Sequence, residues 1–276
     1  MQTSLDKYSR DIKLMNTVHT DGYDFKLNYL DYSSHPTSVS PDAHDHTPDG
    51  EHFFLPYTGN GYIGLSLQST QGIYVNFQKS LSLLLHYNPL VQVYSDTLSR
   101  AEASVIEIRN GLVHLHQCFQ DGIDCFSIQN TLYAHRTRPS LLVEEVLFSN
   151  PSKDSVSFNI LQMGEKQWNH TKSQIVAIDG TEFSLTSGVI DVNIDHKVKH
   201  LCVCVGSSRL PTEMLLNGHE FFKKYTVLTA VKHSSALLTG KLENLEPVLC
   251  ELETQVLEEI KEALRVGYKR VKNKHF

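Results

Sequence analysis

The stretch LVHLHQCFQDGIDCFSIQNTLYAH, residues 112–135, decides the fold class of this chain. Two runs rich in apolar and aromatic residues flank Asp121-Gly122, a dipeptide typical of a hairpin turn. In the first run every second side chain is apolar, as at Val113 and Leu115, which is the pattern of a strand with one buried face. The stretch therefore predicts an antiparallel β-hairpin.

Similar runs recur on both sides of this hairpin, at intervals of about ten residues and with Gly, Asn, Asp and Pro clusters between them. This spacing is typical of an antiparallel sandwich or barrel and not of alternating strands and helices. We therefore expect a mainly β protein. The runs include residues 62–68, 73–78, 104–109, 141–150 and 156–163.

The C-terminal residues 246–276 predict one long amphipathic helix. Pro247 suits the first helical turn, and apolar residues recur at steps of three and four from Leu249 to Val271. Acidic residues in its first half and basic residues in its second half complement the helix dipole. We find no C-terminal stop signal and expect a truncated helix. Its stripe, 249–271, would be covered by a domain that this chain lacks, and the part beyond Arg265 would be exposed.

The N-terminal residues 1–52 are polar and rich in turn formers, so we predict a flexible segment. A sandwich domain at 53–245 and the helix at 246–276 complete the organisation. His44-Asp45-His46, with His35 and His52 nearby, resembles a surface metal cluster, but such a loop gives no rigid support for coordination. Solvated histidines are the favoured interpretation, and we predict no metal or other cofactor.

Composition excludes several classes of protein. The chain has 276 residues, 40% of them hydrophobic, and a net charge of −6, which is typical of a globular domain and gives no reason to expect a nucleic-acid partner. The sequence shows neither a signal peptide at its start nor an apolar run long enough for a transmembrane helix.

The motif GNGYIG, residues 59–64, has the glycine spacing of a dinucleotide-binding loop. That loop needs a helix after its third glycine and an acidic residue about 20 positions later for the ribose. Here a strand-like alternation follows, and no acid lies at that distance. The motif therefore predicts a turn that opens a strand, with Gly59 or Gly61 at positive φ. We assign Gly59, Asn60, Gly61 and Gly64 as structural turn residues.

Other residue groups give no catalytic assignment. Glu144 and Glu145 are adjacent in a predicted strand and so point to opposite faces, as one solvent-facing acid and one edge acid. The sequence contains no G-x-S-x-G nucleophile motif.

The chain has five cysteines. Cys202 and Cys204 fit core thiols. Cys118 and Cys125 flank the predicted hairpin turn, and spacing alone leaves a disulfide and two reduced thiols equally open.

With GNGYIG taken as a turn and strand, the chain resembles the N-terminal β-sandwich of glycoside hydrolase family 65, the disaccharide phosphorylases and their glucosidase relatives. Asn60–Gly64 and Arg109–Val113 match two elements of that domain. A closer resemblance is to a family of uncharacterised animal single-pass membrane proteins of the endoplasmic reticulum. It rests on Asn110–Ile160, above all on Ala134–Pro139 and Asn150-Pro151.

The resemblance implies an antiparallel two-sheet supersandwich followed by the long C-terminal amphipathic helix. In the hydrolase family the general acid lies in a later helical barrel, so no catalytic residue can be transferred to this chain. The leading interpretation is a non-enzymatic lumenal domain of unknown role, with a possible carbohydrate or membrane-protein partner. The alternatives are the accessory domain of a phosphorylase or glucosidase without its barrel, or a carbohydrate-binding module. A binding module would need an exposed aromatic platform that includes Trp168.

The same resemblance bears on two covalent modifications. Relatives in this family keep both cysteines in an oxidising lumen, which implies a disulfide between Cys118 and Cys125. Asn169-His170-Thr171 is the one N-x-[ST] sequon of the chain, and in a lumenal protein Asn169 would carry a glycan.

Overall fold

The computed structural model describes residues 57–268 and the two-residue strand β1 (Leu30–Asp31). Short gaps interrupt the first range at 68–71, 79–80, 108–109, 122–123, 167, 195–196, 221 and 239–244. Apart from β1, the predicted N-terminal segment lies outside the described residues. The histidines and the aspartate of the candidate loop cluster lie there too.

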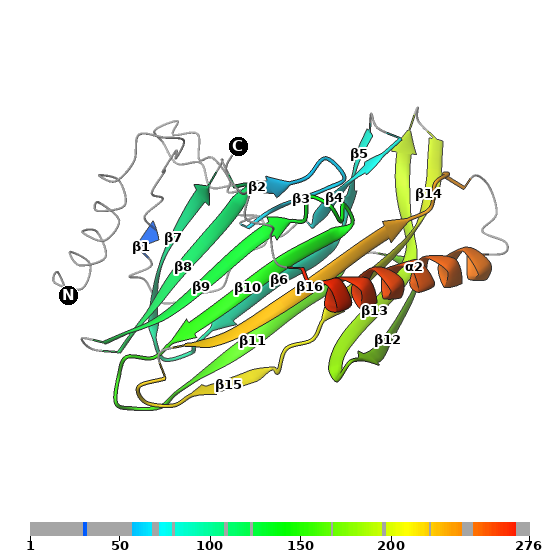
Figure 1. Cartoon of the computed structure of the whole chain (residues 1–276). Helices are drawn as coiled ribbons and strands as arrows, with labels where there is room; N and C mark the ends of the chain where they lie inside the picture. The colour runs from blue at the N-terminus through cyan, green and yellow to red at the C-terminus, as the bar shows by residue number, and fades with distance from the viewer. Residues whose placement is uncertain are drawn as a thin grey trace, which may run out of the picture.

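One layer of the molecule is a nine-stranded sheet with the order β1-β7-β8-β9-β10-β16-β14-β13-β12. Every pairing in it is antiparallel, and the predicted hairpin is the pair β8–β9. Figure 1 shows its long strands running diagonally side by side. The strands are β7 (Ser99–Glu107), β8 (Leu112–Asp121), β9 (Asp124–Ala134), β10 (Leu141–Ser149), β12 (Asn169–Ile178), β13 (Thr181–Ile194), β14 (Lys197–Ser208) and β16 (Lys223–His233).

Two smaller antiparallel sheets pack on one face of this large sheet. One has the order β2-β3-β4-β5 and the other β15-β11-β6. The mainly β, antiparallel fold class is therefore confirmed, although the second layer is divided between two sheets. Their strands are β2 (Tyr57–Gly59), β3 (Ile63–Ser66), β4 (Ile73–Phe77), β5 (Leu81–Leu85), β6 (Tyr87–Tyr94), β11 (Val156–Glu165) and β15 (Glu213–Leu216).

Strand β14 shows why the central strands are apolar on both faces. Leu201, Val203 and Val205 face the smaller sheets, whereas Cys202 and Cys204 face the opposite layer, and all five are buried. Successive side chains of a strand point to opposite faces, so a strand in the middle layer needs apolar residues at every position. Cys202 and Cys204 are core thiols, as predicted.

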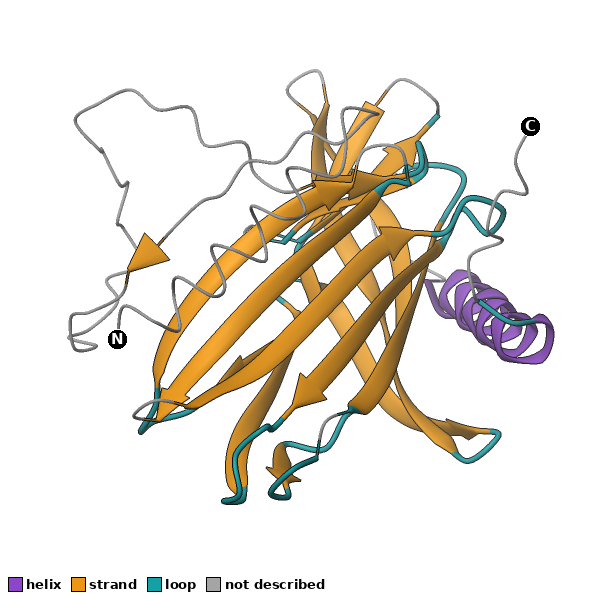
Figure 2. Cartoon of the chain, turned by 60° about the vertical axis from the view of Figure 1, so that its left-hand side comes forward, coloured by secondary structure: helices purple, strands orange, loops and turns teal. Residues whose placement is uncertain are grey.

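Helix α2 (Leu245–Val266) forms the third layer. It crosses β16, β14 and β13 on the face of the large sheet that the smaller sheets leave free (Figures 1 and 2). Gly206 of β14 allows this close approach, because a Cβ there would lie 2.6 Å from Val256 Cγ1. The buried residues of the helix are Leu249, Leu252, Val256, Ile260 and Ala263.

The prediction of a helix that continues to Val271 is wrong. Helix α2 ends at Val266, where Gly267 adopts a φ of 96° and its N–H donates to the Ala263 carbonyl at 3.0 Å. This is a glycine C-cap, a stop signal that lies inside the predicted helix. The large sheet, and not a missing domain, covers the apolar stripe up to Ala263. Tyr133 Oη also donates to the Tyr268 carbonyl at 3.2 Å.

The glycine motif lies at the turn between β2 and β3. Gly59 and Gly64 are paired across the two strands, and Gly61 has a φ of 87°. Gly64 has a second role, because a Cβ at that position would lie 1.6 Å from Tyr57 Oη. The glycine spacing therefore serves a tight turn and the packing of one aromatic ring.

The structure joins Cys118 and Cys125 by a disulfide with a Cα–Cα distance of 5.5 Å. The two residues are diagonal neighbours, because Cys118 lies opposite Ser127 and Cys125 lies opposite Gln120. Cys250 is exposed and free.

Replacing both disulfide cysteines by serine should lower the free energy of unfolding by about 2 kcal/mol, because the unfolded chain then loses a short closed loop. Urea denaturation of protein purified without reductant would measure this, with Cys250→Ser as the control. Equal midpoints for the double variant and the wild-type protein would contradict a stabilising disulfide.

Candidate functional site

The Asn60 side chain connects the glycine turn to a distant loop. Its Oδ1 accepts hydrogen bonds from the Tyr62 and Ile63 N–H groups at 2.9 and 3.0 Å. Its Nδ2 donates to the carbonyls of His135 and Pro139 at 2.8 and 2.9 Å. One amide thus joins the motif that resembles the hydrolase family to the motif that resembles the single-pass family, although they are 75 residues apart.

The loop at 135–140, between β9 and β10, is closed by its own hydrogen bonds. His135 Nδ1 accepts from the Arg138 N–H at 3.2 Å, and the Leu141 N–H donates to the Arg138 carbonyl at 2.9 Å. Burial, followed by the nearby Arg138 charge, lowers the pKa of His135. The imidazole is therefore neutral at physiological pH and can act as this acceptor.

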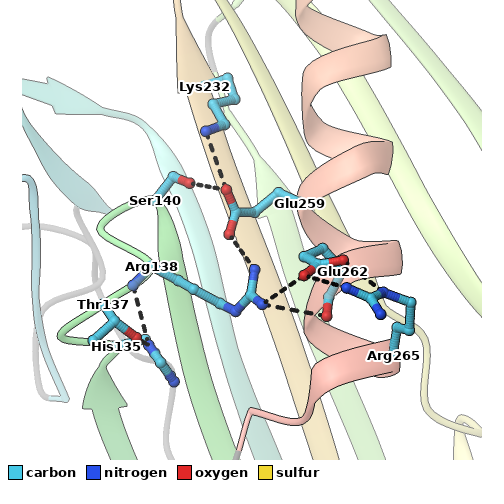
Figure 3. A network of polar contacts seen from close by, with 8 residues as sticks. All are labelled: His135, Thr137, Arg138, Ser140, Lys232, Glu259, Glu262 and Arg265. Carbon is cyan, nitrogen blue, oxygen red and sulfur yellow. Dashed lines mark hydrogen bonds and ion pairs between the residues drawn. The ribbon is translucent and has the colours of Figure 1, made fainter.

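Three elements meet at the Glu259 carboxylate of helix α2 (Figure 3). Its Oε1 accepts from Arg138 Nη1 at 3.4 Å, and its Oε2 accepts from Ser140 Oγ at 3.1 Å. Lys232 Nζ of β16 also donates to Oε2, at 3.2 Å. We call Asn60, His135, Arg138, Ser140, Lys232, Glu259 and Glu262 the motif junction.

The network continues along the helix to the surface. Arg138 Nη2 donates to the main-chain carbonyl of Glu262 at 3.3 Å. The Glu262 carboxylate binds Arg265 through Nε at 2.8 Å and Nη2 at 2.9 Å. Arg138 therefore binds two successive turns of the helix and fixes its position against the sheet.

The charges of the junction are matched internally. Burial alone would raise the pKa of Glu259, but Lys232, Ser140 and Arg138 outweigh burial and hold that pKa below its usual range. Glu259 is thus a carboxylate with three internal donors, which is the environment of a structural ion pair more than of a general acid.

Tyr62 borders the junction and stacks on His233, with ring centroids 5.6 Å apart. Burial, and to a smaller extent Glu259, raises the pKa of Tyr62 to about 12. Its hydroxyl therefore stays protonated at neutral pH and packs as a neutral aromatic side chain.

Asn60→Ala should lower the free energy of unfolding by about 2 kcal/mol, because two main-chain carbonyls and two N–H groups lose their partner. Asn60→Asp keeps the acceptor but places a carboxylate against two carbonyl oxygens. We expect it to be no more stable than Asn60→Ala in thermal unfolding at pH 7. An aspartate variant as stable as the wild-type protein would contradict the role of Nδ2.

Glu144 and Glu145 point to opposite faces of β10, as expected, but Glu144 is not an edge acid. Glu145 is half-buried on the helix-side face, with Lys224 Nζ 2.7 Å away. Glu144 is only 3% exposed and lies between the sheets. Its Oε1 accepts from Asn130 Nδ2 at 2.6 Å, and its Oε2 accepts from the Val91 N–H at 3.0 Å.

The position of β6 explains this buried acid. Strand β6 is the outer strand of its sheet, so its outward N–H and carbonyl groups have no neighbouring strand there. Glu144 binds the Val91 N–H, and Asn130 Nδ2 lies 3.4 Å from the Val91 carbonyl. Two side chains of the large sheet thus take the place of a neighbouring strand. Burial raises the pKa of Glu144 to about 7, against the hydrogen bonds from Asn130 and Val91.

The remaining predicted sites lie apart from the junction. Asn169 is exposed at the start of edge strand β12, and its Nδ2 donates to Asp191 at 3.1 Å. Trp168 is buried and packs on Tyr87, so it does not form the exposed platform that a carbohydrate-binding module needs. Within the described part of the chain, no group of three or more His, Cys, Asp or Glu residues could hold a metal ion.

Sequence motifs pointed to Asn60 and to the loop at 135–140 but not to their partners. Neither Glu259 nor Lys232 belongs to a sequence motif. The one indication for Glu259 was its position in the amphipathic helix, because it directly precedes Ile260, which lies on the buried, sheet-facing side.

Comparison with known proteins places the chain among relatives of unassigned function. It is 27% identical over 195 residues to a protein described as "Uncharacterized protein KIAA2013 homolog" from Xenopus tropicalis, and this match covers 67% of the chain and 31% of the relative. A homologue from Xenopus laevis is 26% identical over 174 residues, which are 60% of the chain and 28% of that relative. The chain therefore spans about a third of the length of these relatives.

A solved structure of a human-microbiome protein, to which kojibiose phosphorylase activity is ascribed, is also similar. Sequence identity is 11%, the TM-score is 0.44, and the match covers 76% of this chain and 34% of that protein. Within the described residues no helix is both long and apolar enough to cross a membrane. The family model described as "Uncharacterized conserved protein (DUF2152)" matches residues 47–276, and the chain belongs to that family.

Proposed function

We propose that this chain is a non-catalytic β-sandwich domain that works in the lumen of the endoplasmic reticulum as part of a membrane-anchored protein. The observation that carries the non-catalytic role is the motif junction. Its Asn60 amide, Arg138 guanidinium and Glu259 carboxylate all bind other parts of the same domain. Residues committed to internal bonds hold a scaffold together and leave little capacity for a substrate.

The lumenal location is supported by the disulfide between Cys118 and Cys125, since such bonds persist in oxidising compartments. The exposed sequon at Asn169 is compatible with the same compartment. Membrane anchoring rests on the resemblance of Ala134–Pro139 and its surroundings to the single-pass family.

The accessibility of the Asn169 sequon to glycosylation in the lumen can be tested by expression behind a cleavable signal sequence in animal cells. We expect one endoglycosidase-sensitive mass increment, which Asn169→Gln removes and Thr171→Ser retains. An unglycosylated secreted protein, or a glycan that persists in Asn169→Gln, would contradict the assignment of this site.

The non-catalytic role can be tested with the purified chain and a panel of disaccharides, with and without inorganic phosphate. We expect no release of monosaccharide. Glu259→Gln should change thermal stability and nothing else. Sugar release that disappears in a folded Glu259→Gln or Glu144→Gln variant would show that the domain is an enzyme.

A further inference from the structure

A cavity of about 210 Å³ lies between the large sheet and the β15-β11-β6 sheet. It is bounded by the start of β6, the middle of β11 and the facing ends of β13 and β14. None of the motif-junction residues lines it. The cavity is therefore separate from the network that fixes helix α2.

Uncharged hydrogen-bonding groups line much of this cavity. Tyr87 contributes a phenol whose pKa is raised by burial, so its hydroxyl stays protonated. Asn88 is 3% exposed, and its Nδ2 has Met163 Sδ as a weak acceptor at 3.6 Å. Further hydroxyls come from Ser184 and from Ser207, whose Oγ also lies 2.9 Å from Thr229 Oγ1.

The Gln162 amide holds the wall of the cavity in place. Its Nε2 donates to the Ser208 carbonyl at 2.9 Å, and its Oε1 accepts from the Leu210 N–H at 3.0 Å. These bonds use one of two N–H groups and one of two lone pairs, so the amide keeps capacity for a ligand. Because the amide is bound at both ends, it presents that capacity in a fixed direction.

The small charge of the lining and its apolar residues indicate which class of ligand the cavity can bind. Arg209 is the only charged residue among the described lining residues, and its Nη1 lies 3.3 Å from Glu182. The site is thus close to neutral. Pro89, Ile160 and Leu210 add apolar surface beside the hydroxyls and amides. A ligand with hydroxyl edges and C–H faces complements such a lining.

We propose that this cavity binds one small neutral polyhydroxy molecule of the size of a single sugar ring or a cyclic polyol. A cavity of about 150 Å³ holds one benzene molecule, so a volume of about 210 Å³ admits one such ring. Because the contact area is small and a neutral ligand forms no ion pair with the site, we expect a dissociation constant of about 1 mM. The inference does not depend on the lumenal location or on the non-catalytic role.

The test is a titration of the full 276-residue chain with glucose and with inositol, in which NMR or calorimetry detects binding. Inorganic phosphate and acetate serve as anionic probes. Ser184→Leu fills the cavity from β13, and Thr212→Trp narrows it from the exposed loop before β15. Thr181→Leu, exposed on β13 and outside the cavity lining, is the matched control.

We expect saturable binding of at least one neutral probe, a loss of tenfold or more in either cavity variant, and no change in the control. Two folded cavity variants guard against a failure of one to fold, which thermal unfolding would reveal. The proposal is overturned if neither neutral probe saturates up to about 50 mM. It is overturned equally if only the anions bind, or if both folded cavity variants bind as the wild-type protein does.

Discussion

Glu259→Gln should lower the free energy of unfolding by about 2–3 kcal/mol at pH 7. The substitution removes the charge that faces Arg138 and Lys232 while keeping the shape of the side chain. The two cations remain partly buried, with 16% and 25% of their side chains exposed, so they cannot recover full hydration. The cost is below that of a fully buried pair because solvent still reaches both partners.

Chemical denaturation measures this effect, and Glu258→Gln is the control. Glu258 precedes Glu259 on the same helix but is exposed, so its change should stay within about 0.5 kcal/mol. Arg138→Gln combined with Glu259→Gln should cost less than the sum of the single variants, since the two residues interact directly. Strict additivity would mean that the ion pair contributes nothing.

The pKa of Glu259 also gives this contribution a pH dependence. Its folded pKa lies below the ordinary carboxyl value of 4.5. The stabilisation is therefore complete above pH 4.5 and is lost as the pH falls through the folded pKa. The cost of Glu259→Gln should accordingly shrink in strongly acidic solution.

The opposite dependence is expected for Glu144, whose folded pKa is raised to about 7 from 4.5. The folded protein binds this proton more tightly than the unfolded chain, so stability rises as the pH falls from about 7 to 4.5. The pKa difference corresponds to about 3 kcal/mol across that interval. In Glu144→Gln the side chain is uncharged at every pH, so the variant should lack this pH-dependent contribution to stability.

The decisive measurement is the free energy of unfolding of the Glu144→Gln variant minus that of the wild-type protein, at two pH values. From pH 5 to pH 8 we expect this difference to change by about 2–3 kcal/mol in favour of the variant. The difference is needed because burial lowers the pKa of His116 to about 4, which makes the folded state less stable as the pH falls below 6.5. Both proteins share that effect, so it cancels.

Glu145→Gln is the matched control for Glu144. It removes a neighbouring carboxylate that is half-buried on the other face of β10 and lies beside Lys224. The difference in free energy of unfolding between this variant and the wild-type protein should be the same at pH 5 and pH 8. If the difference for Glu144→Gln were also the same at both pH values, the Glu144 carboxyl would have an ordinary pKa.

Local patterns were enough to predict the strands and the hairpin. The alternation around Val113 and Leu115 and the turn at Asp121 depend only on neighbouring residues, and the structure has β8 and β9 at those places. The glycine turn at 59–64 was predictable for the same reason. Helix α2 was predicted in its first part, but its end was misplaced because Gly267 was overlooked as a cap.

Long-range contacts decided the rest. The sequence by itself determined that the chain is mainly β, with a C-terminal helix whose apolar stripe must be covered, because periodicity is a local property. Only the tertiary structure decided that Glu144 is a core acid and that Glu259 binds Arg138, since their partners are 53 and 121 residues away. It also decided that Asn60 binds the loop at 135–140. A side chain's environment depends on which strands become neighbours, and no local pattern specifies that choice.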